Sequence, residues 1–423
     1  MAKKASGGQG VKELTRLPKE IRAALFFGSF PPYEEGKHDG GGDYLERLAM
    51  HLGARGLEVH IFTTRDRLHP EPYSISEKVH VWPIVADWSL AGRRSGAFRI
   101  VQSKLNELRP DVMHVIYPDT NRVNRYALPF FLSRLYPKAY LVTTLFGFFA
   151  RGSKPLDILR TYSLYLRSNL IHIPDEWQIQ LFRRLFPYWR RKLWLIPVGS
   201  NVDPPPGLLA ADRTALRTAL GLSPQSAYLA FFGYLHKSKG VDTLLQAMKL
   251  IQAEDSNVKL LLIGGQPAEL ANETERLYLG MIDDLGLRGC VQTTGYLPEG
   301  DIARYLVASD LCVLPFRRNL LGRSSLVSAL SLGVPVLTTK LVEHSAFLRP
   351  GENVFLAPPN DPAALARAIQ TAIATPEALR KVGEGGRQLA ERFRWDTIAG
   401  QWAELYFSLL SKKGRTRQST AAE

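Results

Sequence analysis

Three consecutive prolines, Pro204, Pro205 and Pro206, lie near the middle of the chain and constrain its fold more than any other feature. Proline has no backbone N–H and a fixed φ, so this stretch can continue neither a helix nor a central strand. The segment 201–207 is therefore predicted to be a linker. A chain of 423 residues is also too long for one ordinary hydrophobic core, so we expect a domain on each side.

Short apolar runs alternate with helical patterns on both sides of this linker. The apolar residues of segment 45–52 recur at helical spacing between two apolar runs, which is typical of a βαβ unit. The alternation predicts an α/β protein with two doubly wound parallel sheets. The expected strands are Ala23–Phe27, Val59–Phe62, Val79–Val85, Val112–Tyr117, Tyr140–Thr144, Leu170–Ile173 and Leu193–Pro197, then Tyr228–Phe232, Val258–Ile263, Val291–Thr294, Leu311–Pro315, Pro335–Thr339 and Val354–Ala357.

Five segments are expected along the chain. Residues 1–20 are basic and lack an apolar core, which predicts a disordered lead rather than a signal peptide. Residues 21–202 and 203–390 are predicted to form two Rossmann-like domains. Residues 391–411 carry apolar side chains at helical spacing, so this helix can pack back across a domain, and 412–423 form a polar tail.

Composition narrows the class of protein. The apolar fraction of 45% and the charged fraction of 22% are typical of a soluble globular protein, and no run is long enough to span a membrane. Cys290 and Cys312 lie in or beside expected strands, which favours free thiols in a reducing cytoplasm. The nine histidines show no spacing typical of zinc, so we expect no metal site. The free thiols favour a cytoplasmic location.

The net charge of +14 is concentrated in the first half of the chain. Residues 1–200 contain 30 Lys and Arg against 18 Asp and Glu, whereas residues 201–423 contain 24 against 22. This asymmetry favours an anionic partner for the N-terminal half, such as a phospholipid surface, a phosphate-bearing acceptor or nucleic acid. A basic surface that only aids solubility is the alternative.

The apolar run 228–232 leads into Gly233, a basic loop, Gly240 and a helical pattern. Glycine lets the backbone approach a phosphate, lysine neutralises it, and a helix N-terminus offers N–H groups. The layout predicts that Lys239 binds a diphosphate. A strand, a glycine turn and a surface lysine also occur in α/β domains without a ligand, so this motif alone leaves that alternative open.

A second phosphate candidate is the segment Gly322-Arg323-Ser324-Ser325-Leu326, which precedes an expected helix over 326–332. Serine is a favoured N-cap, so the paired serines could simply cap this helix. We prefer a mixed role, in which Arg323 and the helix N-terminus also face the diphosphate.

Five motifs follow one another in an order typical of one enzyme family. In this order and with this domain spacing, the chain resembles glycosyltransferase family 4 over residues 22–410. The resemblance implies a GT-B fold, in which two Rossmann-like doubly wound domains face each other across a cleft. The motifs are Gly28-Ser29-Phe30-Pro31-Pro32, Gly40-Gly41-Gly42, Ile196-Pro197-Val198-Gly199-Ser200-Asn201, Lys239-Gly240-Val241-Asp242-Thr243-Leu244-Leu245 and Gly333-Val334-Pro335-Val336.

The resemblance also implies roles. The N-terminal domain would take an acceptor and the C-terminal domain a nucleotide-sugar, with retention and without a metal or other cofactor. Lys239 and Arg323 would be the catalytic cations, because a diphosphate leaves with growing negative charge. The loop at Gly40, Gly41 and Gly42 would approach the same phosphates, with Phe146 near the reacting centre. Donor contacts are expected at Gly233, Tyr234, Lys237, Lys239, Gly240, Gly264, Tyr296, Ser324, Ser325, Leu326 and Ser328.

The chain departs from the family pattern in three places. The family has two glutamates eight positions apart, the later one gripping the ribose, where this chain has Leu320 and Ser328. Serine can still hydrogen-bond to a hydroxyl, but leucine cannot act as a carboxylate, so sugar recognition must differ. Tyr234 replaces a basic residue that often follows the strand glycine, leaving His236, Lys237 or Arg323 as the second cation. Phe146 replaces a histidine.

The segment 183–192 interleaves arginines with aromatic residues in the acceptor domain. It could lie at the interface of an anionic membrane. The alternative, which we favour slightly, is a surface helix whose aromatics pack inward and whose arginines are solvated. A nucleic-acid partner is not expected, because no recognisable binding module accompanies the charge.

We therefore expect a transferase that moves a sugar from a nucleotide-sugar to a glycan, lipid-linked or other hydroxyl acceptor, at the inner face of a membrane or in the cytoplasm. One alternative is a non-catalytic GT-B module that binds a glycan or a protein, suggested by Leu320, Ser328 and Phe146. A sugar-nucleotide epimerase is a further alternative, but it needs an acid/base pair that the sequence does not reveal. The base, the sugar, the acceptor and the oligomeric state stay open.

Overall fold

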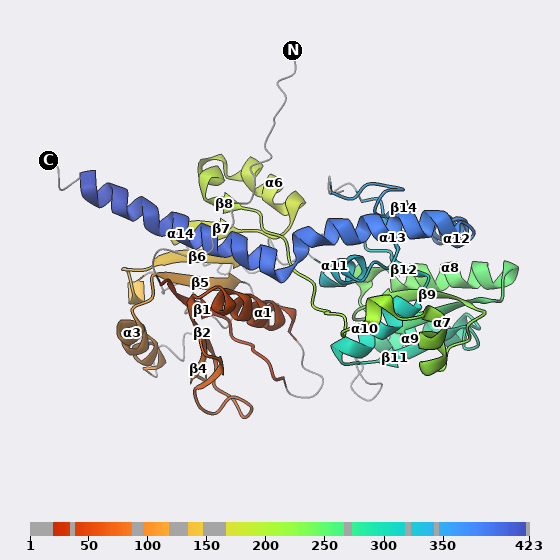
Figure 1. Cartoon of the computed structure of the whole chain (residues 1–423), viewed down its shortest axis with the longest axis horizontal. Helices are drawn as coiled ribbons and strands as arrows, with labels where there is room; N and C mark the ends of the chain where they lie inside the picture. The colour runs from red at the N-terminus through yellow and green to blue at the C-terminus, as the bar shows by residue number, and fades with distance from the viewer. Residues whose placement is uncertain are drawn as a thin grey trace, which may run out of the picture.

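The computed structural model describes residues 20–33, 39–86, 96–117, 134–146, 166–265, 273–317, 323–341 and 347–419. The expected lead up to residue 19 and Leu320 lie outside these ranges. Two α/β domains lie side by side, and the C-terminal helices run along both of them (Figure 1). No described helix combines the length and the apolarity that a membrane crossing requires.

Eight strands form the sheet of the N-terminal domain in the order β3-β4-β2-β1-β5-β6-β7-β8. Neighbours are parallel except β3 and β4. The inner strands are apolar on both faces because helices cover both faces of a parallel sheet. The strands are β1 (Arg22–Phe26), β2 (Glu58–Thr64), β3 (Tyr73–Ser76), β4 (Val79–Val85), β5 (Val112–Tyr117), β6 (Tyr140–Leu145), β7 (Leu170–His172) and β8 (Leu193–Trp194), and the helices are α1 (Gly40–Ala54), α3 (Ala97–Leu108), α6 (Glu176–Leu185) and η1 (Pro187–Lys192).

Six parallel strands form the second sheet in the order β11-β10-β9-β12-β13-β14. They alternate along the chain with helices, as the sequence predicts, and they enclose the larger apolar core. The strands are β9 (Ala227–Phe232), β10 (Val258–Ile263), β11 (Val291–Gly295), β12 (Leu311–Leu314), β13 (Val336–Thr339) and β14 (Phe355–Ala357). The helices are η2 (Leu208–Ala210), α7 (Arg213–Ala219), η3 (Lys237–Lys239), α8 (Val241–Glu254), α9 (Glu273–Asp284), α10 (Glu299–Ala308), α11 (Ser324–Ser331), α12 (Pro362–Ile373), α13 (Pro376–Ala390), η5 (Glu391–Phe393) and α14 (Trp395–Ser419).

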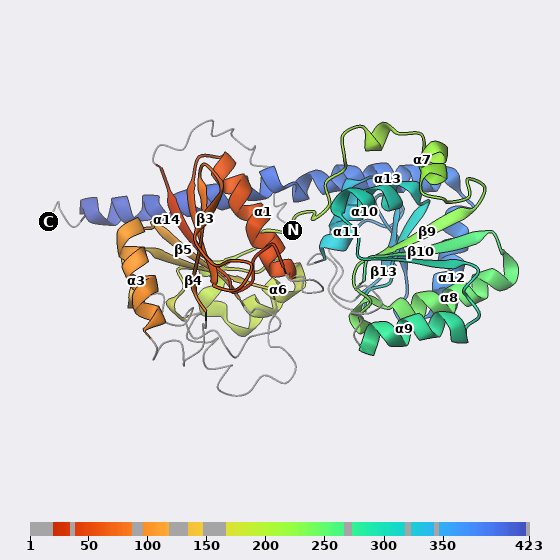
Figure 2. The same ribbon diagram turned by 90° about the horizontal axis from the view of Figure 1, so that it is seen from below.

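Helix α14 returns from the C-terminal domain to the first sheet. Its apolar residues from Trp395 to Leu409 belong to the core of the N-terminal domain, where Trp402 and Tyr406 are fully buried. Figure 2 shows α13 and α14 running along one side of both domains. The helix continues to Ser419, so it extends through most of the segment that the sequence predicts as a polar tail from residue 412.

Two side chains from later parts of the chain hold Ser200, the residue that leads into the linker. The indole N–H of Trp395 donates to the carbonyl of Ser200 (2.6 Å), and the hydroxyl of Ser200 donates to the carbonyl of Val202 (2.8 Å) and accepts from the hydroxyl of Ser328 on α11 (3.1 Å). A Cβ atom on Gly199 would collide with the Trp395 ring, so glycine is required by this close packing. The linker is thereby tied to both domains.

Two features of the first sheet differ from the prediction. The antiparallel strand β3 was not expected, because a four-residue strand of half-exposed and polar residues carries little apolar signal. Strand β8 ends at Trp194, earlier than the expected Pro197, and two residues later the carbonyl of Ile196 accepts from the side chain of His172 (2.7 Å).

A buried polar chain joins α14 to the first sheet. The Ile196 carbonyl can only accept, so His172 carries its proton on Nε2 and its Nδ1 accepts from the Thr144 hydroxyl (2.9 Å). Thr144 in turn accepts from Nε2 of His114 (2.6 Å), whose Nδ1 accepts from Tyr406 (2.6 Å). Burial lowers the pKa of His114 well below its usual value and that of His172 to about 4, so both rings are neutral.

Acidification should destabilise the protein through these histidines. Between about pH 6.5 and pH 4 an unfolded chain binds protons that the folded protein excludes, so stability that is present above about pH 6.5 is lost as the pH falls. His172 alone should lower the free energy of unfolding by about 2 kcal/mol between about pH 8 and pH 5. Denaturant unfolding at the two pH values measures this difference.

The matched controls are His172→Gln and Tyr406→Phe. The glutamine does not titrate, so it should reduce the difference between the two pH values. The phenylalanine removes only the contact with His114, so it should lower stability by a similar amount at both. If the unfolding free energy of His172→Gln depended on pH as strongly as that of the wild type, the loss of stability would come from other groups and the prediction would be wrong.

Candidate functional site

A cavity of about 930 Å³ lies between the two domains. It is next to the two points where the strand order reverses, because β1 pairs with β2 and β5, and β9 pairs with β10 and β12. Open α/β sheets bind ligands at the carboxyl ends of strands beside such points. Eight of the residues predicted from the sequence line this cavity: Gly40, Gly233, Tyr234, Lys239, Gly264, Tyr296, Ser324 and Ser325.

Two glycines bring Lys239 into the cavity after β9. Gly233 has a φ of 127°, so the backbone requires glycine, and a Cβ atom there would displace Nζ of Lys239. Gly240 has a φ of 69°, and its Cβ atom would overlap the carbonyl oxygen of Pro315. The ammonium group of Lys239 is therefore held against the backbone at the end of the strand.

Lys239 is a half-buried cation without a carboxylate partner among the described residues. Neither a hydrogen bond nor an ion pair joins it to a residue in that part of the chain. Burial lowers the pKa of Lys239 to about 7, and the positive charge of Arg323 lowers it further. A buried ammonium group is unstable without a counter-charge, so this position favours an anionic ligand.

Arg323 lies close to Lys239 at the N-cap position of α11. Its guanidinium group donates to the hydroxyl of Ser238 (3.3 Å) and lies 5.4 Å from the centroid of the Phe316 ring. Burial lowers the pKa of Arg323, whereas the carboxylate of Asp175, from the N-terminal domain, raises it. Two cations from neighbouring loops are thus gathered on the C-terminal side of the cleft.

Ser324 and Ser325 form the first turn of α11 and do not cap it, in contrast to the capping alternative. Ser325 is only 4% exposed, and its buried hydroxyl oxygen has no hydrogen-bond partner. An unsatisfied buried hydroxyl costs about 1–3 kcal/mol. Because Ser325 lines the cavity, a ligand with acceptor oxygens there could satisfy it.

Gly40, Gly41 and Gly42 form the first turn of α1, which corrects the prediction of a loop. The Asp39 side chain accepts from the Gly41 N–H (2.9 Å) and so caps the helix. A Cβ atom on Gly42 would overlap the Tyr33 hydroxyl, so that glycine is required by packing. Of the three glycines, Gly40 is the one that lines the cavity.

The wall formed by α1 is acidic, which the sequence analysis missed. Asp43 and Glu46 follow Gly40 at three-residue spacing and line the cavity from the N-terminal domain. Burial and the neighbouring charge of Asp43 raise the pKa of Glu46. The three-residue spacing of Asp43 and Glu46 was visible in the sequence. It indicates a shared helix face only if the helix is known to begin at Gly40.

Arg47 crosses the cleft, and it too was missed. It forms ion pairs with Asp203 in the linker and with Glu299 at the start of α10. These pairs raise the pKa of Arg47 although burial opposes them. An ion pair across 252 residues has no signal in a single sequence.

The other predicted site residues lie outside the lining of the cavity. Ser328 is buried against Ser200 of the linker, and Phe146 packs edge-on against Tyr44 at 5.0 Å between ring centroids. The remaining positions are Gly41, Gly42, Lys237, Gly240, Arg323 and Leu326. Among the described residues, no three His, Cys, Asp or Glu side chains are grouped so that they could hold a metal ion.

Two family models match the chain. Residues 38–203 match the model described as Glycosyltransferase Family 4, and residues 226–375 match the one described as Glycosyl transferases group 1. A D-inositol 3-phosphate glycosyltransferase of Streptomyces scabiei (strain 87.22) is 26% identical over 445 residues, covering 99% of this chain and 97% of that protein. One from Thermobispora bispora is 24% identical, covering 93% and 96%.

Solved structures resemble the whole fold. Sucrose-phosphate synthase from Thermosynechococcus elongatus has a TM-score of 0.73 at 20% identity, covering 93% of this chain and 100% of that one. HepE from Anabaena, solved in complex with UDP and glucose, has a TM-score of 0.70 at 18% identity, covering 92% and 100%.

The lowered pKa of Lys239 makes a prediction for anion binding. Above about pH 7 the empty site loses its proton, so pyrophosphate should bind the wild type less well as the pH rises. The Lys239→Arg variant keeps its charge, and the titration of pyrophosphate itself is common to both proteins. The ratio of wild-type to variant dissociation constants should rise about tenfold from about pH 6 to pH 8. Calorimetric titration measures it, and a constant ratio would contradict the assignment.

Proposed function

Since the chain belongs to the group 1 type of glycosyltransferases, with a family 4 N-terminal domain and a GT-B fold, we propose that it transfers a sugar from a nucleotide-sugar to a hydroxyl group of a glycan or lipid-linked acceptor. The family resemblance and the fold predicted from the sequence are thereby confirmed. The nucleotide-sugar donor, the acceptor, the stereochemistry and the independence from metal belong to the proposal.

The observation that carries the proposal is the unpaired, half-buried cation of Lys239 in the lining of the cleft, which also includes Ser325 with its unsatisfied hydroxyl. The ammonium group favours a negative charge and the hydroxyl favours an acceptor oxygen, and a nucleoside diphosphate supplies both. Arg323 adds a second positive charge close by. The cavity volume of about 930 Å³ is within the range of small-molecule sites.

The chemistry follows from these charges. The bond between the sugar and the diphosphate oxygen breaks while an acceptor oxygen forms a bond to the same carbon. The departing diphosphate gains negative charge, which Lys239 and Arg323 stabilise. With retention, the incoming hydroxyl approaches from the leaving-group side and passes its proton to the departing oxygen, so no protein nucleophile is needed. The protein then acts by positioning and electrostatics.

A UDP-sugar is the first donor to test, because HepE was solved with UDP and glucose. In a thermal-shift measurement with EDTA present, one nucleotide-sugar among UDP-, GDP-, ADP- and dTDP-sugars should stabilise the wild type. Binding at about 100 times the dissociation constant adds about 2.7 kcal/mol to stability. Lys239→Ala and Ser325→Ala should reduce the shift, the first more strongly.

The matched control is Lys237→Ala, which removes a neighbouring lysine outside the cavity lining. It should keep the shift. A nucleotide-sugar that stabilises wild type and Lys239→Ala equally would overturn the proposed donor site. Donor binding without transfer to any acceptor would instead favour a non-catalytic module, and a shift that needs added Mg²⁺ would contradict independence from metal.

The acceptor side includes a basic aromatic patch, which we define as Trp177, Arg184, Leu185, Tyr188 and Trp194. Helix α6 turns Ile179 and Phe182 into the core, and Phe186 stacks on Trp189 at 4.8 Å. These aromatics follow the inward-packing alternative. The patch residues point outward instead, and Tyr188 is 95% exposed.

We propose that this patch contacts an anionic membrane surface that presents a lipid-linked acceptor. Exposed Trp, Tyr and Leu side chains combined with arginines suit the boundary between headgroups and acyl chains. The Arg190 side chain on η1 donates to the carbonyl of Arg183 on α6 (3.2 Å). Asp175, the N-cap of α6, attracts Arg323 of the C-terminal domain, so the helix that carries Trp177, Arg184 and Leu185 of the patch also borders the cleft.

Co-sedimentation with liposomes tests this contact. The wild type should bind vesicles rich in phosphatidylglycerol at low salt and bind phosphatidylcholine vesicles weakly. The double variant Trp177→Ser/Tyr188→Ser should lose most of this binding. The matched control is Leu277→Ser, which removes a 62% exposed leucine from α9 of the other domain. Equal binding by all three proteins would sink the proposal and leave donor binding untouched.

A further inference from the structure

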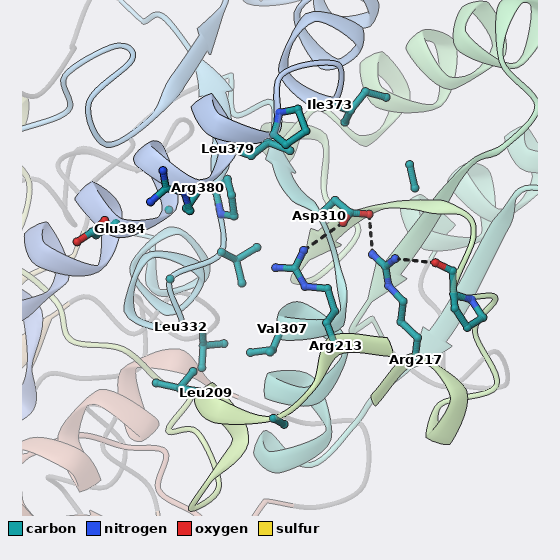
Figure 3. A pocket seen from close by; sticks show the side chains of 18 of the residues that line it. Leu209, Arg213, Arg217, Val307, Asp310, Leu332, Ile373, Leu379, Arg380 and Glu384 are labelled. Atoms are coloured by element: carbon teal, nitrogen blue, oxygen red, sulfur yellow. Dashed lines mark hydrogen bonds and ion pairs between the residues drawn. The ribbon is translucent and has the colours of Figure 1, made fainter. Parts of the chain in front are cut away.

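A second cavity, of about 880 Å³, lies in the C-terminal domain away from the cleft. Its lining includes Ala227 at the start of β9 and Pro335 just before β13. Lys239 follows the opposite, carboxyl end of β9, so the two cavities lie at opposite edges of the sheet. Figure 3 shows this cavity, which we call the arginine cavity after Arg213, Arg217, Arg380 and Arg387 in its lining.

One wall of the arginine cavity is an internally neutralised cluster. Arg213 and Arg217 share the carboxylate of Asp310, at 3.1 and 2.6 Å (Figure 3). Arg217 is 7% exposed and also donates to the carbonyl of Ala308 (2.9 Å). The Asp310 carboxylate further accepts the backbone N–H of Tyr228 (2.8 Å). The Asp310 carboxylate is therefore neutralised by its own partners. A bound anion on this wall would contact Arg213 and Arg217.

The other wall carries cations without partners. Arg380 and Arg387 are seven residues apart on α13, so they lie on one face two turns apart. Neither forms an ion pair or a side-chain hydrogen bond with another residue of the described ranges. Glu384 lies between them in the lining, and Arg380 and Glu384 lie across the cavity from Arg213 (Figure 3).

The charges in the lining do not balance. Four arginines face two carboxylates, those of Asp310 and Glu384, which leaves two positive charges in excess. Between the charged walls lies an apolar surface formed by Leu209, Leu332, Val334, Ile373 and Leu379. The ligand that fits carries two negative charges on a compact group and an organic body of moderate size.

We propose that the arginine cavity binds a small phosphomonoester, whose phosphate lies between Arg380, Arg387 and Arg213 and whose organic part lies on the apolar surface. A phosphomonoester carries about two negative charges near neutral pH and accepts hydrogen bonds from several guanidinium groups. This site is separate from the proposed donor site. It contacts α13, which leads through η5 into α14 and the linker contact of Trp395.

Calorimetric titration with glucose 6-phosphate and with inorganic phosphate tests the site. The titrated protein is Lys239→Ala, because this change removes the main anion-binding group of the cleft. We expect one binding event at low salt. In the triple variant Lys239→Ala/Arg380→Ser/Arg387→Ser the affinity should fall about tenfold or more, since each charge-assisted contact contributes at least a factor of this order.

The matched control is Lys239→Ala/Arg367→Ser, which removes an exposed arginine from α12 outside the cavity lining and should keep the affinity. Because Arg380 and Arg387 are exposed, their loss should leave the unfolding temperature unchanged. Absence of binding to Lys239→Ala at millimolar ligand, or equal affinity with and without the two arginines, would overturn the proposal.

A separate readout keeps this result apart from the donor site. Arg380→Ser/Arg387→Ser on the wild-type background should bind the nucleotide-sugar donor as the wild type does. If glucose 6-phosphate binds more weakly to this double variant while donor binding is unchanged, the two sites are distinct. A parallel loss of donor binding would show that the arginines act on the cleft rather than on a site of their own.

Discussion

The return of α14 to the N-terminal domain is the interaction on which the arrangement of the cleft depends. The second sheet follows the linker in the chain, and the last long helix, α14, then packs into the core of the N-terminal domain. Trp395 at the start of that helix holds the linker through Ser200, and Ser200 in turn holds α11 through Ser328. The ion pairs of Arg47 join α1 to α10 across the same junction.

This arrangement sets charges of opposite sign on the two sides of one cavity. The C-terminal side carries Lys239 and Arg323, whose burial makes a diphosphate a favourable partner. The α1 side carries Asp43 and Glu46. Under the proposed function, a donor phosphate would bind to the first wall, whereas hydroxyl groups of a sugar or an acceptor would hydrogen-bond to the carboxylates of the other.

Local patterns predicted the fold because each βα unit buries its own apolar face. The strand pattern of 228–232 and the glycines around Lys239 also predicted the cavity wall that contains Lys239, since Gly233 and Gly240 are required by the backbone itself. The same local reasoning failed at Gly40–Gly42, where Asp39 caps a helix that the glycines alone do not suggest. It failed for Ser328, whose hydroxyl is used by the linker.

The sequence by itself determined the two α/β domains, the linker and the position of Lys239 at the end of a strand, because these depend on apolar periodicity and backbone conformation within short segments. Tertiary structure decided what faces Lys239. The acidic face of α1 lies opposite Lys239 only in the folded cleft, and the ion pairs of Arg47 and the arginine cavity join residues that are distant along the chain. Their contacts exist only after the sheets have packed and α14 has docked, so no spacing in the sequence encodes them.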